Sequence, residues 1–244
     1  QYADRGIDIA AVGIGVPGVV DTQTGHVLAT ANLPLDDTDL GRKVSEACGL
    51  PVVVGNDVTL STMGEAWYGA GRGVSNLFGV FVGTGIGGGL VIDGKMYLGA
   101  HGGSGEVGHM QVASEGPQCG CGRVGCLEAF ASRTAVERDI RDAVNSGRPS
   151  LLADRVAAGK RIKSAKVRKA LEERDEVTTE VVRHAATSLG KGIGSVANIL
   201  DPDVIVVGGG LIQACGMFMM PQVVAAAEER MMPVPGGAIP IVSS

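Results

Sequence analysis

The chain has 244 residues and a mildly acidic formal charge of −5, and its 39 glycines are more than twice the usual share of about 7%. These values exclude collagen, because the glycines have no regular period, and a disordered chain, because 45% of the residues are apolar. The acidic charge and the scarcity of aromatic side chains argue against a general nucleic-acid-binding protein. Glycine lets backbone approach a ligand closely, so the excess suggests that backbone serves as a binding surface.

The apolar segments are short, and none reaches the ~18 uninterrupted apolar residues of a membrane helix. No charged-then-apolar secretion signal is visible. Three of the five cysteines lie between positions 119 and 126, which is a poor disulfide framework and a better metal site. We therefore expect a cytoplasmic protein without a membrane span. Because strand patterns lie close to both Gln1 and Ser244, we also expect both termini to be incomplete.

The first part of the chain alternates strand and helix patterns. We expect a buried strand within Ile7–Val16, a hairpin over Val19–Asp21 and Gly25–Ala29, a helix over Leu40–Cys48 ended by Gly49, a strand over Val52–Val54 and a helix over Val58–Tyr68.

The second part begins with a strand and ends with a helix. We expect a strand over Leu77–Val82, a glycine-rich turn over Gly83–Gly89, a hairpin of Leu90–Ile92 and Lys95–Leu98, a loop over Gly99–Cys126, a helix over Leu127–Asn145, a charged and exposed helical segment over Leu151–Glu176, a long helix from about Val181 to Leu200, a strand over Val204–Val207, and a helix around Pro221–Met231. Strands followed by glycines recur, which predicts an α/β architecture whose strand ends meet a ligand.

Two glycine clusters are candidates for nucleotide contacts. Gly83–Gly89 contains a G-x-G-x-x-G pattern, but a hairpin follows it instead of the helix that a Rossmann site needs. The interpretation that remains is a turn whose amides clamp phosphate, with Thr84 adding a hydroxyl, and the alternative is a tight hairpin without a ligand. For Gly208–Gly210 the alternatives are close approach of a nucleotide and close packing of strand on helix.

The cysteine cluster predicts a metal site. Cys119, Cys121 and Cys126 with His109 make a three-cysteine, one-histidine set, which is a closed tetrahedral zinc set. Glycines between the ligands would let the loop wrap tightly, and the alternative is a group of reduced thiols without metal. The other two cysteines, Cys48 and Cys215, stand in apolar surroundings and are expected in the core.

Polar residues near these segments suggest a polyhydroxy ligand. If one ring nitrogen of His109 binds zinc, the other is a fixed donor that can orient a substrate hydroxyl. Asp57 follows a predicted buried strand, where α/β active sites lie, and a carboxylate there can accept the proton of an alcohol. The alternative for the pair Asn56-Asp57 is a helix N-cap, because Asp57 precedes the helix predicted over Val58–Tyr68. Asn56, Glu106 and Glu128 would add hydrogen bonds to the ligand.

These motifs together resemble the ROK family of repressors and sugar kinases. The most specific parts are Glu106-Val-Gly-His109 and Cys119-x-Cys121-Gly-x-x-Gly-Cys126-x-Glu128, supported by Gly15-Val-Pro-Gly18, Asn56-Asp57, Gly64-Glu65 with Gly69-Ala-Gly71, Gly83–Gly89 and Gly208–Gly210. The resemblance covers nearly the whole chain.

The resemblance implies a role for each matching residue. Asp57 is the expected catalytic base for a sugar 6-hydroxyl. The implied substrate ligands are Asn56, Asp57, Glu106, His109 and Glu128, and the implied ligands of a structural zinc are His109, Cys119, Cys121 and Cys126. The implied nucleotide contacts are Gly83, Thr84, Gly85, Gly87, Gly88, Gly208, Gly209 and Gly210.

The resemblance also implies a fold and cofactors. We expect a two-domain actin-like ATPase fold of the hexokinase and ribonuclease H type, with a structural zinc loop, that uses Mg²⁺ and ATP and closes around a hexose to exclude water. Residues 1–62 would form an incomplete small domain for sugar and ATP, 63–234 the large domain, and 235–244 the start of a C-terminal return. ROK kinases begin with a strand and an Asp-x-Gly-Gly-Thr loop, which this sequence lacks, so part of the ATP site is expected to be absent.

The leading hypothesis is an ATP-dependent, glucokinase-like hexose kinase of carbohydrate metabolism and glycolysis, acting as a homo-oligomer, either dimer or tetramer. Two alternatives stay open: a sugar-responsive repressor that reads DNA through an N-terminal winged helix, and a non-catalytic sugar sensor. The sugar also stays open, because glucose, N-acetylglucosamine and N-acetylmannosamine kinases of the family share these motifs.

Overall fold

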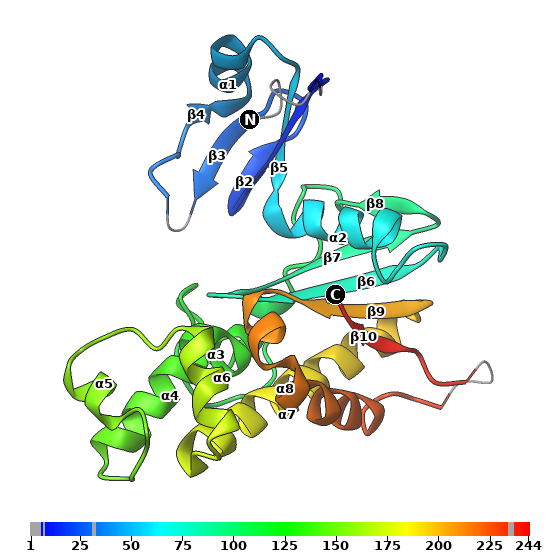
Figure 1. The fold of residues 1–244 in the computed structure, drawn as a ribbon. Coiled ribbons are helices and arrows are strands. Elements are labelled where there is room, and N and C mark those ends of the chain that lie inside the picture. Colours follow the sequence, from blue (N-terminus) through cyan, green and yellow to red (C-terminus); the bar gives the residue numbers. More distant parts are fainter. Residues whose placement is uncertain (1–5, 7, 31–32, 234–236) are drawn as a thin grey trace.

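The computed structural model describes residues 6, 8–30, 33–233 and 237–244, which form a smaller and a larger lobe (Figure 1). The smaller lobe contains β1 (Val12–Val16), β2 (Gly18–Asp21), β3 (His26–Thr30), β4 (Thr38–Asp39), α1 (Leu40–Cys48) and β5 (Val52–Asn56). β1 pairs in parallel with β5, and β2, β3 and β4 form an antiparallel sheet. Its core is small and consists of Val16, Val27 and Val54 with partly buried neighbours.

Local sequence signals explain the smaller lobe well. The predicted hairpin and the helix Leu40–Cys48 are confirmed, and Gly49 ends that helix in the left-handed region with φ of 71°. The first strand is shorter than predicted, because it begins at Val12, and Ile7 lies outside the described residues. Alternate residues of β1 are exposed, so the predicted buried strand is buried only at Val16.

The larger lobe surrounds a five-stranded sheet with the order β10–β9–β6–β7–β8 (Figure 1). Its strands are β6 (Leu77–Val82), β7 (Ile86–Ile92), β8 (Lys95–Tyr97), β9 (Val204–Gly208) and β10 (Ile241–Ser243). β6, β9 and β10 are parallel, and β7 runs antiparallel to β6. Its helices are α2 (Asp57–Tyr68), α3 (Leu127–Ala131), α4 (Arg133–Asn145), α5 (Ala153–Ala157), α6 (Ser164–Glu172), α7 (Glu176–Leu200) and α8 (Gly210–Glu228), with one 3-10 turn at Val107–His109.

Helices cover both faces of this sheet. Phe78, Val80 and Val82 of β6 belong to the main core, which contains residues of α3, α4, α7 and α8. Leu77 belongs to a second core on the opposite face, against which Ala66 of α2 packs. This alternation has the period of two that a strand buried on both faces allows.

Glycines of β7 allow α2 to lie close to the sheet. A Cβ at Gly87 would stand 2.7 Å from Val58 of α2, and one at Gly89 would overlap Thr62 of the same helix. The turn predicted over Gly83–Gly89 is therefore shorter than expected, because Ile86 already begins β7. Gly87–Gly89 are strand residues whose missing side chains make room for a helix.

Two predicted helices are corrected by the structure. The helix predicted over Leu127–Asn145 is broken at Ser132, which has extended backbone and caps α4 by accepting a hydrogen bond from the N–H of Ala135. The helix predicted around Pro221–Met231 begins at Gly210 and contains Pro221 in its interior. The last turn of the prediction also lies beyond the helix end at Glu228.

Tertiary packing overrides local signals in these segments. Leu211, Cys215 and Met219 of α8 are buried, so burial of this face stabilises the helix despite its proline. α8 is long and apolar enough by composition to cross a membrane, and it packs these residues into the core of the larger lobe. Residues 151–176 were expected to be exposed, but Val156 and Ile162 are buried in the same core. Cys48 is exposed, in contrast to the expected core position, whereas Cys215 is buried as expected.

Candidate functional site

Asp57 begins α2, directly after β5 and at the edge between the two lobes (Figure 1). Its neighbour Asn56 is the helix cap, because the Oδ1 of Asn56 accepts hydrogen bonds of 3.0 Å from the N–H groups of Val58 and Thr59. The capping alternative for the Asn56-Asp57 pair is therefore confirmed at Asn56, and Asp57 is the first residue of the helix. The carboxylate of Asp57 is half-buried, and its Oδ1 is 3.0 Å from the N–H of Val58. The N-terminal end of α2, where this carboxylate lies, carries the positive end of the helix dipole.

Asn56 also links α2 to the turn after β1. Its Nδ2 donates to the carbonyl of Gly18 at 3.1 Å. Gly15 lies beside Asp57, because a Cβ at Gly15 would stand 3.2 Å from the Cα of Asp57. The predicted turn Gly15–Gly18 and the Asn56-Asp57 pair are thus brought together, although the Asn56 amide already holds backbone on both sides.

The loop of Gly83, Thr84 and Gly85 joins β6 to β7 and is held by its carbonyls. The Gly83 carbonyl accepts from the Arg133 N–H at 3.0 Å, and the Thr84 carbonyl accepts from the Thr134 hydroxyl at 2.7 Å. In the described part of the chain, no group accepts a hydrogen bond from the N–H of Thr84 or Gly85. Adjacent free N–H groups on a tight loop form a concave site for an anion.

The residues that hold this loop were not selected from the sequence. Ser132, Arg133 and Thr134 lie at the break between α3 and α4, and that break places α4 against the loop. A serine before a helical pattern is an N-cap signal, so the break itself could have been found. Nothing in the sequence indicates that Arg133 reaches Thr84, 49 positions away.

The second glycine cluster lies beside the first. β6 and β9 are parallel neighbours, and Phe81 pairs with Gly208. A Cβ at Gly209, whose φ is 92°, would stand 2.6 Å from backbone atoms of Val82. Gly208 and Gly209 therefore allow close packing, whereas Gly210 faces open space at the first turn of α8. The structure brings both predicted nucleotide segments to one edge of the sheet.

Glu128 connects the glycine loop with the cysteine cluster. It lies in α3, and its Oε2 accepts from the N–H of Ile86 at 2.9 Å. Its Oε1 is 3.6 Å from the Sγ of Cys119. A side chain at Gly85 would overlap Glu128, so this approach depends on glycine.

The cysteine cluster has the dimensions of a tetrahedral zinc site. The ligand atoms of His109, Cys119, Cys121 and Cys126 all lie within 4.8 Å of one another. Tetrahedral zinc places two thiolate sulfurs about 3.8 Å apart, because each Zn–S distance is about 2.3 Å. The Sγ atoms of Cys121 and Cys126 are 3.7 Å apart, and the Sγ of Cys119 is 3.6 Å from the Nδ1 of His109. These four residues fit zinc.

Backbone geometry and electrostatics of this loop agree with a cation. Gly122 and Gly125 have φ of 85° and 82°, so they turn the loop as expected, whereas Gly120 has neither positive φ nor crowding. Burial raises the pKa of Cys119 to about 12, and the backbone N–H of Arg123 lowers the pKa of Cys121 to about 7. A buried thiol such as Cys119 needs a neighbouring positive charge to ionise at neutral pH.

Glu106 and His109 lie on the solvent side of the cluster. The Nε2 of His109 is 3.9 Å from the Oε2 of Glu106, and the side chains are 32% and 67% exposed. Because Nδ1 faces Cys119, Nε2 is left for an outer partner, as the sequence predicts. Gly108 lies against Ile86, and Gly105 against Gly88, so this segment is anchored on β7.

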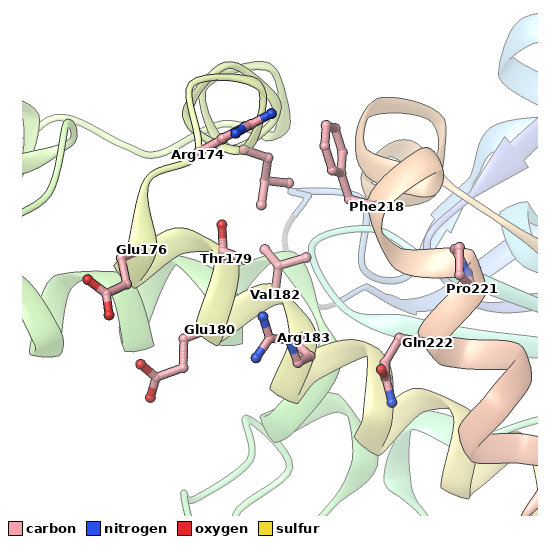
Figure 2. A pocket seen from close by; sticks show the side chains of 10 residues that line it. Arg174, Glu176, Thr179, Glu180, Val182, Arg183, Phe218, Pro221 and Gln222 are labelled. Atoms are coloured by element: carbon pink, nitrogen blue, oxygen red, sulfur yellow. The ribbon is translucent and has the colours of Figure 1, made fainter.

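A groove of about 900 Å³ lies elsewhere, between α6, α7 and α8 (Figure 2). Charged side chains of both signs line it around an apolar part that includes Val182 and Phe218. None of the residues selected from the sequence lines this groove.

Comparison with known proteins places the chain in a family. It matches the model of the ROK family over residues 1–240. It is 37% identical over 215 residues to a glucokinase of Halalkalibacterium halodurans, which covers 88% of this chain and 65% of that protein. It is 33% identical over 203 residues to a xylose repressor of Caldicellulosiruptor bescii, which covers 82% of this chain and 50% of that protein.

Solved structures agree with this placement. The crystal structure of a ROK family glucokinase from Streptomyces griseus, in complex with glucose and AMPPNP, is 30% identical, with a TM-score of 0.84 over 99% of this chain and 78% of that one. The α/β fold is therefore that of ROK family sugar kinases. The chain spans between half and two thirds of the length of the two curated relatives. Because the family model covers nearly every residue, the chain belongs to the ROK family.

Proposed function

We propose that the protein containing this chain is an ATP-dependent hexose kinase that phosphorylates the 6-hydroxyl of glucose. The observation that carries this proposal is the Gly83–Gly85 loop: its Gly83 and Thr84 carbonyls are bound to α4, and within the described residues its N–H groups at Thr84 and Gly85 are free for an anion. The glucokinase relative and the glucokinase complex with glucose and AMPPNP support hexose and ATP as the substrate classes.

Asp57 is the proposed base. In phosphoryl transfer the sugar hydroxyl oxygen bonds to the terminal phosphorus, the bond from that phosphorus to the bridging oxygen breaks, and ADP leaves. The carboxylate of Asp57 would accept the hydroxyl proton as this occurs. The proposed hydroxyl ligands are Asn56, Glu106, His109 and Glu128. The carboxylate of Glu128 already accepts a hydrogen bond from the backbone N–H of Ile86. A sugar hydroxyl would therefore compete with this N–H for Glu128.

The proposed nucleotide contacts are Gly83, Thr84, Gly85, Gly87, Gly88, Gly208, Gly209 and Gly210. In the structure Gly83 and Gly210 face open space and Gly85 lies against Glu128, whereas Gly87 and Gly88 pack against Val58 and the 105–107 segment. Gly87 and Gly88 would therefore support the loop rather than contact phosphate. Mg²⁺, bound with ATP, would neutralise phosphate charge as the leaving oxygen becomes negative.

The proposed zinc would be structural. Its ligands His109, Cys119, Cys121 and Cys126 form a closed set, which leaves no coordination position for substrate. Bound zinc would hold the thiolates and fix the tautomer of His109 so that Nε2–H faces the sugar.

We infer a small domain of residues 1–62, a large domain of 63–234 and a C-terminal return from 235. α2 is continuous across the first boundary, and β10 extends the larger sheet beside β9, so the proposed hinge is the β5–α2 junction. We further propose a homo-oligomer in the cytoplasm, where reducing conditions keep the zinc thiols free.

The second candidate is a sugar-responsive repressor or a sugar sensor without catalysis, which the xylose repressor relative favours. A coupled ADP-release assay on the full-length protein with glucose, mannose, N-acetylglucosamine and N-acetylmannosamine separates the candidates. We expect turnover that is fastest with glucose. Absence of turnover with every sugar, together with sugar-dependent DNA binding, would overturn the kinase proposal. Faster turnover with an N-acetylhexosamine would replace only the substrate.

A further inference from the structure

The start of α4 holds the Gly83–Gly85 loop through three hydrogen bonds. Two bind carbonyls, as described above, and the third joins the Nη2 of Arg133 to the Oγ1 of Thr84 at 3.0 Å. Thr84 is exposed at the tip of the loop, yet its side chain and backbone are both held. This arrangement depends on the break at Ser132, which makes Arg133 the first residue of α4.

The contact between Arg133 and Thr84 determines how the threonine hydroxyl is used. A guanidinium only donates hydrogen bonds, and a hydroxyl has one donor and two acceptor positions. Thr84 must therefore accept from Arg133, and its own O–H proton points elsewhere. The free donors of the loop are then the Thr84 hydroxyl and the N–H groups of Thr84 and Gly85, which together suit the oxygens of a phosphate.

Arg133 is itself fixed by a second interaction. Its Nη1 is 3.2 Å from the Oε2 of Glu137, and the two side chains are only 12% and 13% exposed. Glu137 also pairs with Arg141 at 2.9 Å and accepts from the N–H of Ile162. Because Glu137 is held on several sides, the Arg133 guanidinium has one orientation, and its Nη2 faces the loop.

We propose that Arg133 is a positioning residue for the nucleotide phosphates, which acts by fixing the Thr84 hydroxyl as a donor. This inference rests on the proposed use of ATP. Arg133 lies outside the glycine motif, at the start of α4. On this proposal α4, together with the loop, determines how phosphate is bound.

The test measures the affinity of the full-length protein for AMPPNP with Mg²⁺ by calorimetry, beside the KM values for ATP and hexose. Arg133→Gln and Thr84→Val each remove the contact, and we expect each to weaken AMPPNP binding by about tenfold while the hexose KM stays within about twofold. The double variant is expected to be no weaker than either single variant, because both lose one interaction. Arg133→Lys keeps a donor and is expected to recover part of the affinity.

Arg148→Gln is the matched control, since it removes an arginine ion pair, with Glu180, that involves neither Glu137 nor Thr84. We expect this variant to bind AMPPNP as the unaltered protein does. Unchanged affinity in both Arg133→Gln and Thr84→Val, or an equal loss in Arg148→Gln, would overturn the inference. If the protein binds AMPPNP but transfers no phosphate to any sugar, the kinase proposal is refuted. The AMPPNP affinities of the variants then still decide the role of Arg133. A protein that binds no nucleotide would refute both.

Discussion

At the scale of single residues, the Asn56 amide and the Asp57 carboxylate have different roles at the start of α2. The Asn56 side chain caps the helix and binds the Gly18 carbonyl, so it is structural in this state. In the described part of the chain the Asp57 carboxylate accepts one hydrogen bond, from the N–H of Val58 to Oδ1, and its other oxygen is the one left for chemistry. The sequence pair Asn-Asp predicts that a cap is present, but only the structure shows which of the two residues is the cap.

Replacing Asp57 by Asn tests the proposed base. The amide keeps the size of the side chain and an oxygen for the Val58 N–H, but it cannot accept a proton. We expect hexose phosphorylation to fall by at least about 100-fold, which is typical for the loss of a general base, while sugar binding partly survives. Steady-state kinetics and calorimetric sugar titration measure the two effects. Unchanged turnover would refute the assignment, and Ser61→Ala serves as the control, because it changes an exposed side chain of α2 that donates only to the backbone carbonyl of Asp57.

At the scale of elements, helix ends and glycines decide how the larger lobe packs. α7 begins at a buried cap, Asp175, whose carboxylate accepts from the N–H groups of Thr178 and Leu151. α7 and α8 approach closely because Gly190 and Gly194 face backbone of α8. In the same way Gly89 makes room for α2 on the sheet. Each of these contacts connects segments that are far apart in the sequence.

Asp175→Ala is expected to destabilise the fold by about 1–3 kcal/mol, because buried N–H groups lose their acceptor. Burial raises the pKa of Asp175, but hydrogen bonds from Thr178, Leu151 and Ser150 outweigh it and hold the pKa below the usual 3.8. The carboxylate therefore contributes its full stability above the unfolded pKa and loses it as the pH falls through the lower folded pKa.

Urea denaturation between about pH 7 and pH 3 measures this effect. The destabilisation by Asp175→Ala should be largest near neutral pH and should shrink below about pH 4. Asp154→Ala, at an exposed position of α5, is the control and should change stability by no more than about 0.5 kcal/mol. A destabilisation that is the same at all these pH values would contradict the role of the charge.

Gly89→Ala tests the packing of α2 on β7. The new methyl group would overlap Thr62, which is completely buried, so we expect a loss of about 1–3 kcal/mol. Gly216→Ala in α8 is the matched control, because its methyl group would meet neighbours at 3.4 Å or more and alanine favours a helix by up to about 1 kcal/mol. Thermal melting should separate the two variants in opposite directions, and equal melting temperatures would count against this account of the glycines.

At the scale of the whole molecule, the cysteine loop of residues 119–126 connects the sheet of the larger lobe to the helices that pack against it. Glu128 lies between Cys119 and Ile86, and the 105–109 segment rests on β7. A bound zinc would therefore stabilise the site region and not only its own loop. Any change at Glu128 would therefore affect the positions of loop 83–85, α4 and the cysteine loop together.

Metal analysis of the purified full-length protein tests this connection. We expect about one zinc per chain, and we expect chelation or Cys126→Ser to lower the melting temperature, because a closed zinc site contributes folding free energy. Cys48→Ser is the control, since Cys48 is exposed and lies outside the cluster, and it should keep both the zinc and the melting temperature. Less than about one zinc per chain, or a melting temperature insensitive to chelation, would contradict a structural zinc.

The sequence by itself determined many local elements and the grouping of His109 with three cysteines, because these depend on short-range patterns. The period of apolar residues and the glycine after Cys48 predict α1 to the residue, and four ligands within eighteen positions predict the cluster. Only the tertiary structure decided the burial of Val156 and Ile162 and the start of α8 at Gly210. Burial against distant helices outweighs local propensity at these positions. The contact of Arg133 with Thr84 is likewise a product of tertiary packing, since no short-range pattern relates residues 49 positions apart.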